Sequence, residues 1–130
     1  MVDEKSSIAL VTGASRGIGK AIAIELASRD LMVVGTATTD EGSNKITSYL
    51  KDMRIPGAGM TVNVADDQSV ERLLGEINEK YGSPTVLINN AGITRDNLLM
   101  RMKVDEWHGV IDTNLNSMFR VTKLCLKGMT

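Results

Sequence analysis

The sequence predicts an α/β protein built on a doubly wound parallel sheet, and three observations carry this prediction. Four short apolar runs alternate with four segments of helical periodicity, which gives the order β-α-β-α-β-α-β-α. The apolar runs are continuous rather than alternating, as is typical of strands buried on both faces. At 130 residues and 42% hydrophobic side chains, the chain has the size and composition of one globular domain.

The elements are predicted in order from the apolar runs and the turn residues between them. Strands are expected at 8–11, 31–36, 59–64 and 86–88, and helices at 18–27, 40–53, 66–81 and 104–129. Pro56 and Gly57 break the second helix, Asp66 is expected to cap the third, and Gly82 to end it. Parallel strands in this order are joined by right-handed crossovers, with helices on both faces of the sheet.

A glycine-rich turn, Thr12-Gly13-Ala14-Ser15-Arg16-Gly17-Ile18-Gly19, joins the first strand to the first helix. Gly13 is expected to take a positive φ, Gly17 to let the backbone approach a ligand, and Gly19 to let the helix pack tightly on the strand. The unpaired N–H groups and the dipole of the helix favour an anion there. Strand, glycine turn and helix together predict a Rossmann-type unit that binds a dinucleotide, although the spacing is Gly-x-x-x-Gly-x-Gly.

The end of the second strand indicates which dinucleotide. It reads Gly35-Thr36-Ala37-Thr38, without the acid that usually bonds the ribose 2′-hydroxyl of NAD. Asp40 comes two residues late and is better explained as the start of a helix. Arg16, inside the glycine turn, suits a 2′-phosphate, and Thr36 and Thr38 add hydroxyl donors. The sequence therefore favours NADP(H) over NAD(H).

Composition excludes several other classes of protein. A net charge of −1 argues against nucleic acid as the main partner. The sequence shows no signal peptide and no apolar run long enough to span a membrane, so a soluble cytoplasmic protein is expected. Cys125 is the single cysteine and is expected to be a small core residue. No metal site is predicted, because the single histidine, His108, has no partner ligands in a metal-binding pattern.

A second motif, Asn89-Asn90-Ala91-Gly92, follows the fourth strand, and with the glycine turn it resembles the short-chain dehydrogenase/reductase family. Residues 13–16, 35–38 and 90–102 are similar to one subfamily, the 3-oxoacyl-[acyl-carrier-protein] reductases of bacterial fatty-acid synthesis. The resemblance implies NADPH-dependent reduction of 3-oxoacyl-[acyl-carrier-protein] to the (3R)-3-hydroxyacyl product. It also implies acyl carrier protein as a partner and a homotetramer in the cytoplasm.

The resemblance also implies roles for particular residues. Asn114 matches the asparagine of the family's Asn-Ser-Tyr-Lys catalytic set, which holds a helix kink and a water of the proton relay. An asparagine inside a helix is locally unfavourable, which makes a role for Asn114 more credible. The cofactor residues are Gly13, Ala14, Ser15, Arg16, Gly17, Ile18 and Gly19 for the phosphates, Thr38 for the adenosine end, Asn63 and Val64 for the adenine, and Asn90, Ala91 and Gly92 for the nicotinamide ribose.

The family's proton donor has no counterpart in this sequence. The family uses a serine and a Tyr-x-x-x-Lys motif as its proton donor. In this sequence the fourth residue after Tyr49 is Met53 and the fourth residue after Tyr81 is Thr85, so neither tyrosine forms the motif. Residues 1–130 are therefore expected to be the N-terminal NADP-binding part of a single Rossmann domain, with four of the family's seven strands, incomplete at the C-terminus and inactive alone. The fourth strand, 86–89, is then expected to form an exposed apolar edge.

Two alternatives to the reductase stay open. One is another NADP-dependent short-chain ketoreductase, and the other is a catalytically inactive nucleotide-binding or oligomerisation fragment. Residues 95–130 carry six basic and four acidic side chains. The basic residues in this part could meet acidic acyl carrier protein or form an ordinary solvated face, and they include Arg101, Lys103, Arg120, Lys123 and Lys127.

Overall fold

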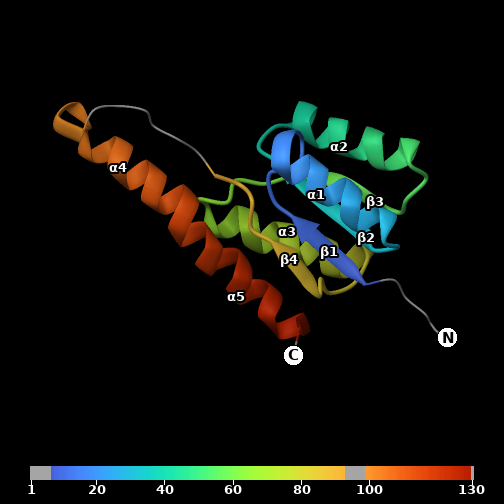
Figure 1. The fold of residues 1–130 in the computed structure, drawn as a ribbon. Coiled ribbons are helices and arrows are strands. Elements are labelled where there is room, and N and C mark those ends of the chain that lie inside the picture. Colours follow the sequence, from blue (N-terminus) through green and yellow to red (C-terminus); the bar gives the residue numbers. More distant parts are fainter. Residues whose placement is uncertain (1–6, 93–98, 130) are drawn as a thin grey trace.

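A computed structural model describes residues 7–92 and 99–129 of the chain. Its four strands are β1 (Ile8–Val11), β2 (Met32–Ala37), β3 (Gly57–Thr61) and β4 (Val86–Ile88). They form one parallel sheet in the order β3-β2-β1-β4, which confirms the predicted α/β fold of Rossmann type (Figure 1). The segment 93–98 of the stretch compared with the reductase subfamily lies outside the described residues.

Helices cover both faces of the sheet, as the continuous apolar strands predict (Figure 1). The helices α1 (Gly17–Ser28) and α2 (Asp40–Asp52) lie on one face, and α3 (Asp67–Lys80) lies on the other with α5 (Ser117–Met129). Each face has its own core. The first is built around Val11, Val33, Ile46 and Leu50, and the second around Leu10, Val34, Leu73, Ile77 and Val121.

The third strand is two to three residues earlier than predicted. It spans Gly57–Thr61 rather than 59–64, because Gly57 pairs with Val33 and β2 ends opposite Thr61 at Ala37. A side chain at Gly57 would lie 2.0 Å from the Val33 carbonyl oxygen, so only glycine fits at this start. After Thr61 the Val62 N–H still donates to the Ala37 carbonyl at 2.9 Å, and the Asn63 N–H then turns to the Ser69 hydroxyl at 2.9 Å.

The last predicted helix is interrupted. A short 3-10 turn η1 (Leu99–Arg101) precedes α4 (Val104–Val110), and a π-helical segment η2 (Ile111–Asn116) joins α4 to α5. Such π turns inside longer helices are frequent at functional sites. The rod formed by α4, η2 and α5 lies beside α3 and β4 and extends past the sheet (Figure 1).

The strand β4 pairs only with β1 among the described residues and forms the partly exposed apolar edge that the sequence predicts. Asn89, just after β4, donates to the Thr122 hydroxyl on α5 at 3.1 Å, which ties this edge to the long helix. Within residues 7–92 and 99–129, no helix is both long and apolar enough to cross a membrane.

Candidate functional site

The predicted cofactor residues gather at one edge of the sheet. The glycine turn follows β1, Thr38 follows β2, Asn63 and Val64 follow β3, and residues 90–92 follow β4. All four strands are parallel, so these segments share the carboxyl edge, where open α/β sheets bind their ligands.

Thr12 joins the glycine turn to the segment after β4. Its hydroxyl oxygen accepts hydrogen bonds from the backbone N–H groups of Asn90 and Ala91, both at 3.0 Å. Its own N–H donates to the Ile88 carbonyl at 3.1 Å, which extends the pairing of β1 and β4 by one residue. Thr12 is only 2% exposed, so this link is part of the core rather than of the surface.

A second link makes the junction too tight for side chains. The Asn90 amide donates to the Gly13 carbonyl at 2.8 Å, and Gly13 has φ +67°. A Cβ on Gly19 would lie 2.1 Å from the Gly13 carbonyl oxygen and 2.4 Å from Asn90 Nδ2. Gly19 is therefore needed for packing, as predicted, but the helix packs on the turn and on Asn90 rather than on the strand itself.

The start of α1 presents an open cradle. Gly17 has φ +61°, and a Cβ there would meet nothing within 4 Å, so this backbone borders free space. The first turn of α1 contains no acidic residue. Arg16 caps this helix, is exposed, and forms no hydrogen bond or ion pair through its side chain with the described residues. Free helix N–H groups beside an uncommitted guanidinium fit a phosphate-bearing group.

The peptide groups of Ala14 are fixed from both sides. Its N–H donates to the Thr36 carbonyl at 2.8 Å, and its carbonyl accepts from the Tyr49 hydroxyl at 2.7 Å. Burial raises the pKa of Tyr49 to about 12, so this phenol stays protonated at neutral pH. Lys20 lies 5.3 Å from the centre of the Tyr49 ring. These contacts fix the backbone just before Ser15 and Arg16. Because Ala14 is fully buried, it can offer only backbone groups to the site.

The end of β2 corrects one expectation and confirms another. Thr36 is 1% exposed and its hydroxyl accepts from the Gly13 N–H at 3.3 Å, so it faces the turn and does not offer a donor to a ribose. Thr38 is exposed and remains a predicted contact. Asp40 begins α2 and accepts a hydrogen bond from the Thr61 hydroxyl at 2.9 Å, in agreement with its interpretation as a helix-start residue.

The residues after β3 offer different groups. Asn63 is exposed, and its side-chain oxygen accepts from the Ala65 N–H at 3.0 Å, which holds the amide in a turn. Val64 is 6% exposed and its side chain belongs to the core, so only its backbone could border an adenine. Asp66 caps α3 through the Gln68 N–H at 3.0 Å, as predicted.

Asn114 lies in the π-helical segment and reaches the segment after β4. A Cβ on Gly92 would lie 3.0 Å from Asn114 Oδ1, so the glycine makes room for this amide. The structure thus brings Asn114, the predicted catalytic residue, next to Gly92, one of the three residues predicted for the nicotinamide ribose.

Arg120 is not the surface residue that the sequence suggested. Its side chain is 18% exposed, and its guanidinium is paired with Asp67 and with Asp112. These hydrogen bonds hold the pKa of the Asp112 carboxyl below its ordinary value and raise that of Arg120. A contact of Arg120 with acyl carrier protein is therefore a wrong expectation, because its donors are used internally.

Other candidates keep structural roles. Cys125 is 1% exposed and lies in the core as predicted, and burial raises the pKa of its thiol to about 11. His108 is exposed on α4. In the part of the chain that the structure describes, no three His, Cys, Asp or Glu side chains are grouped to hold a metal ion.

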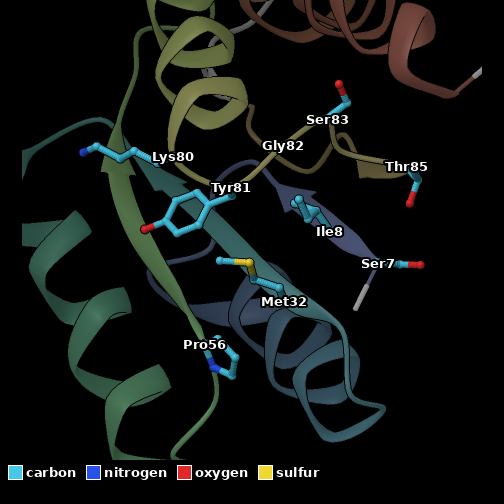
Figure 2. A pocket seen from close by; sticks show the side chains of 9 residues that line it. All are labelled: Ser7, Ile8, Met32, Pro56, Lys80, Tyr81, Gly82, Ser83 and Thr85. Atoms are coloured by element: carbon cyan, nitrogen blue, oxygen red, sulfur yellow. The ribbon is translucent and has the colours of Figure 1, made fainter. Parts of the chain in front are cut away.

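A hollow of about 610 Å³ lies at the opposite, amino edge of the sheet and is distinct from this site. Figure 2 shows the residues around it, which come from the start of β1 and β2, the turn before β3, the end of α3 and the segment between α3 and β4. The lining residues are Ser7, Ile8, Met32, Pro56, Lys80, Tyr81, Gly82, Ser83 and Thr85. None of the predicted cofactor residues takes part in it.

Sequence reasoning missed the roles of Thr12, Tyr49 and Arg120. Thr12 stands inside the motif, and its hydroxyl could have been suspected from its place beside Gly13. Tyr49 and Arg120 act on segments 35 and 56 residues away in sequence, and no local pattern announces such contacts.

A parallel doubly wound sheet with a glycine turn at its carboxyl edge is typical of dinucleotide-binding domains. The chain belongs to the short chain dehydrogenase family, whose sequence model matches residues 7–130. It is therefore part of an oxidoreductase lineage that uses a nicotinamide cofactor.

Several curated proteins that are similar to this chain are named 3-oxoacyl-[acyl-carrier-protein] reductase FabG. Those of Pseudomonas aeruginosa, Vibrio cholerae and Escherichia coli are 52%, 53% and 51% identical to this chain over 97%, 96% and 96% of its length. The chain covers 51%, 50% and 50% of these relatives, so it spans about half of their length.

Proposed function

We propose that this chain is the N-terminal, NADP-binding part of a single Rossmann domain whose whole protein reduces 3-oxoacyl-[acyl-carrier-protein] to (3R)-3-hydroxyacyl-[acyl-carrier-protein]. The observation that carries the proposal is the bonded junction of Thr12, Gly13 and Asn90 at the carboxyl edge. This junction occurs in a chain that is 52% and 53% identical, over the aligned residues, to two curated proteins named 3-oxoacyl-[acyl-carrier-protein] reductase.

The preference for NADP(H) rests on Arg16 and on the end of β2. Arg16 stands at the start of α1 with its guanidinium uncommitted among the described residues. The first acid after β2 is Asp40, which begins α2 and accepts a hydrogen bond from Thr61 at the end of β3. A free guanidinium at this place favours a 2′-phosphate over a 2′-hydroxyl.

The residues of this chain would bind and orient the cofactor. The backbone of Gly17 and the first turn of α1 hold the phosphates, and Asn90 to Gly92 border the nicotinamide ribose. The bound cofactor supplies the hydride for the β-carbonyl. Asn114, against Gly92, holds the proton-relay water at this end. The proton donor is not Tyr49, because its hydroxyl is bonded to Ala14 and its pKa is raised.

The partners follow from the same proposal. The substrate is a 3-oxoacyl thioester on acyl carrier protein, and the whole enzyme is a cytoplasmic homotetramer. The exposed apolar side chains of the α4–α5 rod support a subunit contact, among them Trp107, Leu115, Met118 and Phe119. Arg101, Lys103, Lys123 and Lys127 remain candidates for the acidic carrier.

Intact mass and turnover test the proposal together. The protein purified from its natural source should have about twice the 14.1 kDa of this chain and should oxidise NADPH in the presence of an acetoacetyl thioester. NADPH binding without turnover of this thioester, but with turnover of another ketone, would favour a different short-chain ketoreductase.

A mass near 14.1 kDa with nucleotide binding and no turnover would instead favour an inactive nucleotide-binding or oligomerisation fragment.

A further inference from the structure

One guanidinium joins three segments of the chain. Arg120 Nη1 donates to the Val64 carbonyl at 3.1 Å, Nε donates to the Asp67 carboxylate, and Nη2 donates to Asp112 Oδ1 at 2.7 Å. These acceptors belong to the stretch after β3, to the start of α3 and to the π-helical segment. Arg120 itself stands on α5.

The geometry of this contact is specific to arginine. A guanidinium presents its donors in a planar fork, so it can bond two carboxylates and a carbonyl at once, whereas a lysine ammonium is a single point charge. The Arg120 side chain is 18% exposed, while Asp67 and Asp112 are 76% and 38% exposed. The guanidinium is therefore more buried than either carboxylate that it bonds.

Two of the joined segments carry opposite ends of the cofactor site. Val64 directly follows Asn63, which belongs to the adenine end. Asp112 lies two residues before Asn114, and Asn114 lies against Gly92. Asp112 also accepts from Asn116 at 3.1 Å, so the same carboxylate braces the π-helical segment. Arg120 therefore contacts both the stretch at the adenine end and the segment that carries Asn114.

We infer that Arg120 is a positioning residue, which holds the Asn63–Val64 stretch and the π-helical segment of Asn114 in fixed relation and so aligns the two ends of the cofactor site. This inference rests on the proposed function for its ligand. The claim that one side chain fixes the two segments rests only on the contacts of Arg120 and does not depend on the ligand.

The test compares Arg120→Met and Arg120→Lys with two controls on the same helix. Val121→Ala truncates the buried neighbour and lowers stability but removes no hydrogen bond of Arg120, and Lys123→Met removes an exposed cation one turn away. Hydrogen exchange of the ligand-free protein and the affinity for 2′,5′-ADP, the adenosine half of NADP, are measured for each variant.

In Arg120→Met, exchange should rise together at residues 63–65 and 111–116, and 2′,5′-ADP should bind about tenfold more weakly. Arg120→Lys should recover only part of the affinity, and the two controls should keep it. Unchanged exchange and affinity in Arg120→Met would overturn the inference, as would the same losses in Val121→Ala. If the wild-type protein bound neither 2′,5′-ADP nor NADPH, the proposed function would fall first, and the role of Arg120 in the site with it.

Discussion

Gly19→Ala is the substitution whose effect the structure fixes most closely. Glycine inside a helix normally costs about 0.5–1 kcal/mol relative to alanine, so the change alone should stabilise α1. The added methyl group, however, would stand 2.1 Å from the Gly13 carbonyl oxygen, and contacts under 3.0 Å do not occur. The turn or the helix must therefore move by nearly an ångström, and backbone cannot give way as a flexible side chain can.

The magnitude follows from the contacts that would be lost. Overpacking costs about 1–3 kcal/mol, and the hydrogen bond from Asn90 to Gly13 contributes about 1 kcal/mol. After the gain in helix propensity is subtracted, Gly19→Ala should lower the free energy of unfolding by about 1–3 kcal/mol. It should also weaken nucleotide binding, because Asn90 and the glycine turn separate.

Gly75→Ala is the matched control, since Gly75 also lies inside a helix and a Cβ there meets nothing within 4 Å. Urea unfolding followed by circular dichroism should show Gly75→Ala stabilised by about 0.5–1 kcal/mol and Gly19→Ala destabilised. If both variants were stabilised alike, the tight junction between α1, the glycine turn and Asn90 would be refuted.

Three further predictions concern the supports of the site. Tyr49→Phe leaves the Ala14 carbonyl without its donor and should cost about 1 kcal/mol in urea unfolding and weaken NADPH binding; an unchanged affinity would contradict its role behind the turn. Thr12→Val removes the acceptor of two backbone N–H groups and should cost about 1–3 kcal/mol, whereas Thr12→Ser should cost less; equal losses would contradict this role. The pKa of Asp112 is lowered chiefly by Arg120, so the stability from this pair is present at neutral pH and is lost as the pH falls below about 4. Asp112→Asn should flatten that acid loss in urea midpoints measured against pH, and an identical acid profile would contradict the pairing.

The sheet and the glycine turn could be predicted because their signals are local. Continuous apolar runs separated by helical periods predict parallel strands, and Asp40 and Asp66 mark helix starts that the structure confirms. The predicted bounds of β3 were wrong because the ends of a strand depend on the strand that it pairs with, here β2. The ladder stops where β2 stops, and Gly57, which looks like a turn residue in the sequence, pairs with Val33.

The candidate site was predictable in its residue types and much less in its supports. Arg16 and Asn90 stand in recognisable motifs, whereas Arg120 looks like any surface cation on a helix. Its role arises from Val64, 56 residues earlier, and from a π-helical segment that helical periodicity does not distinguish from α-helix. Such contacts depend on tertiary packing, which a single sequence does not encode in any local pattern.

The central claim, that the carboxyl edge binds NADP(H) through Arg16, is tested most directly by calorimetric titration of NADPH and NADH into the wild-type protein and Arg16→Ala. The account predicts that the wild type binds NADPH more tightly than NADH. It also predicts that Arg16→Ala loses affinity for NADPH by about tenfold or more while NADH changes little. Equal losses for the two nucleotides, or a wild type that binds NADH as well as NADPH, would contradict it.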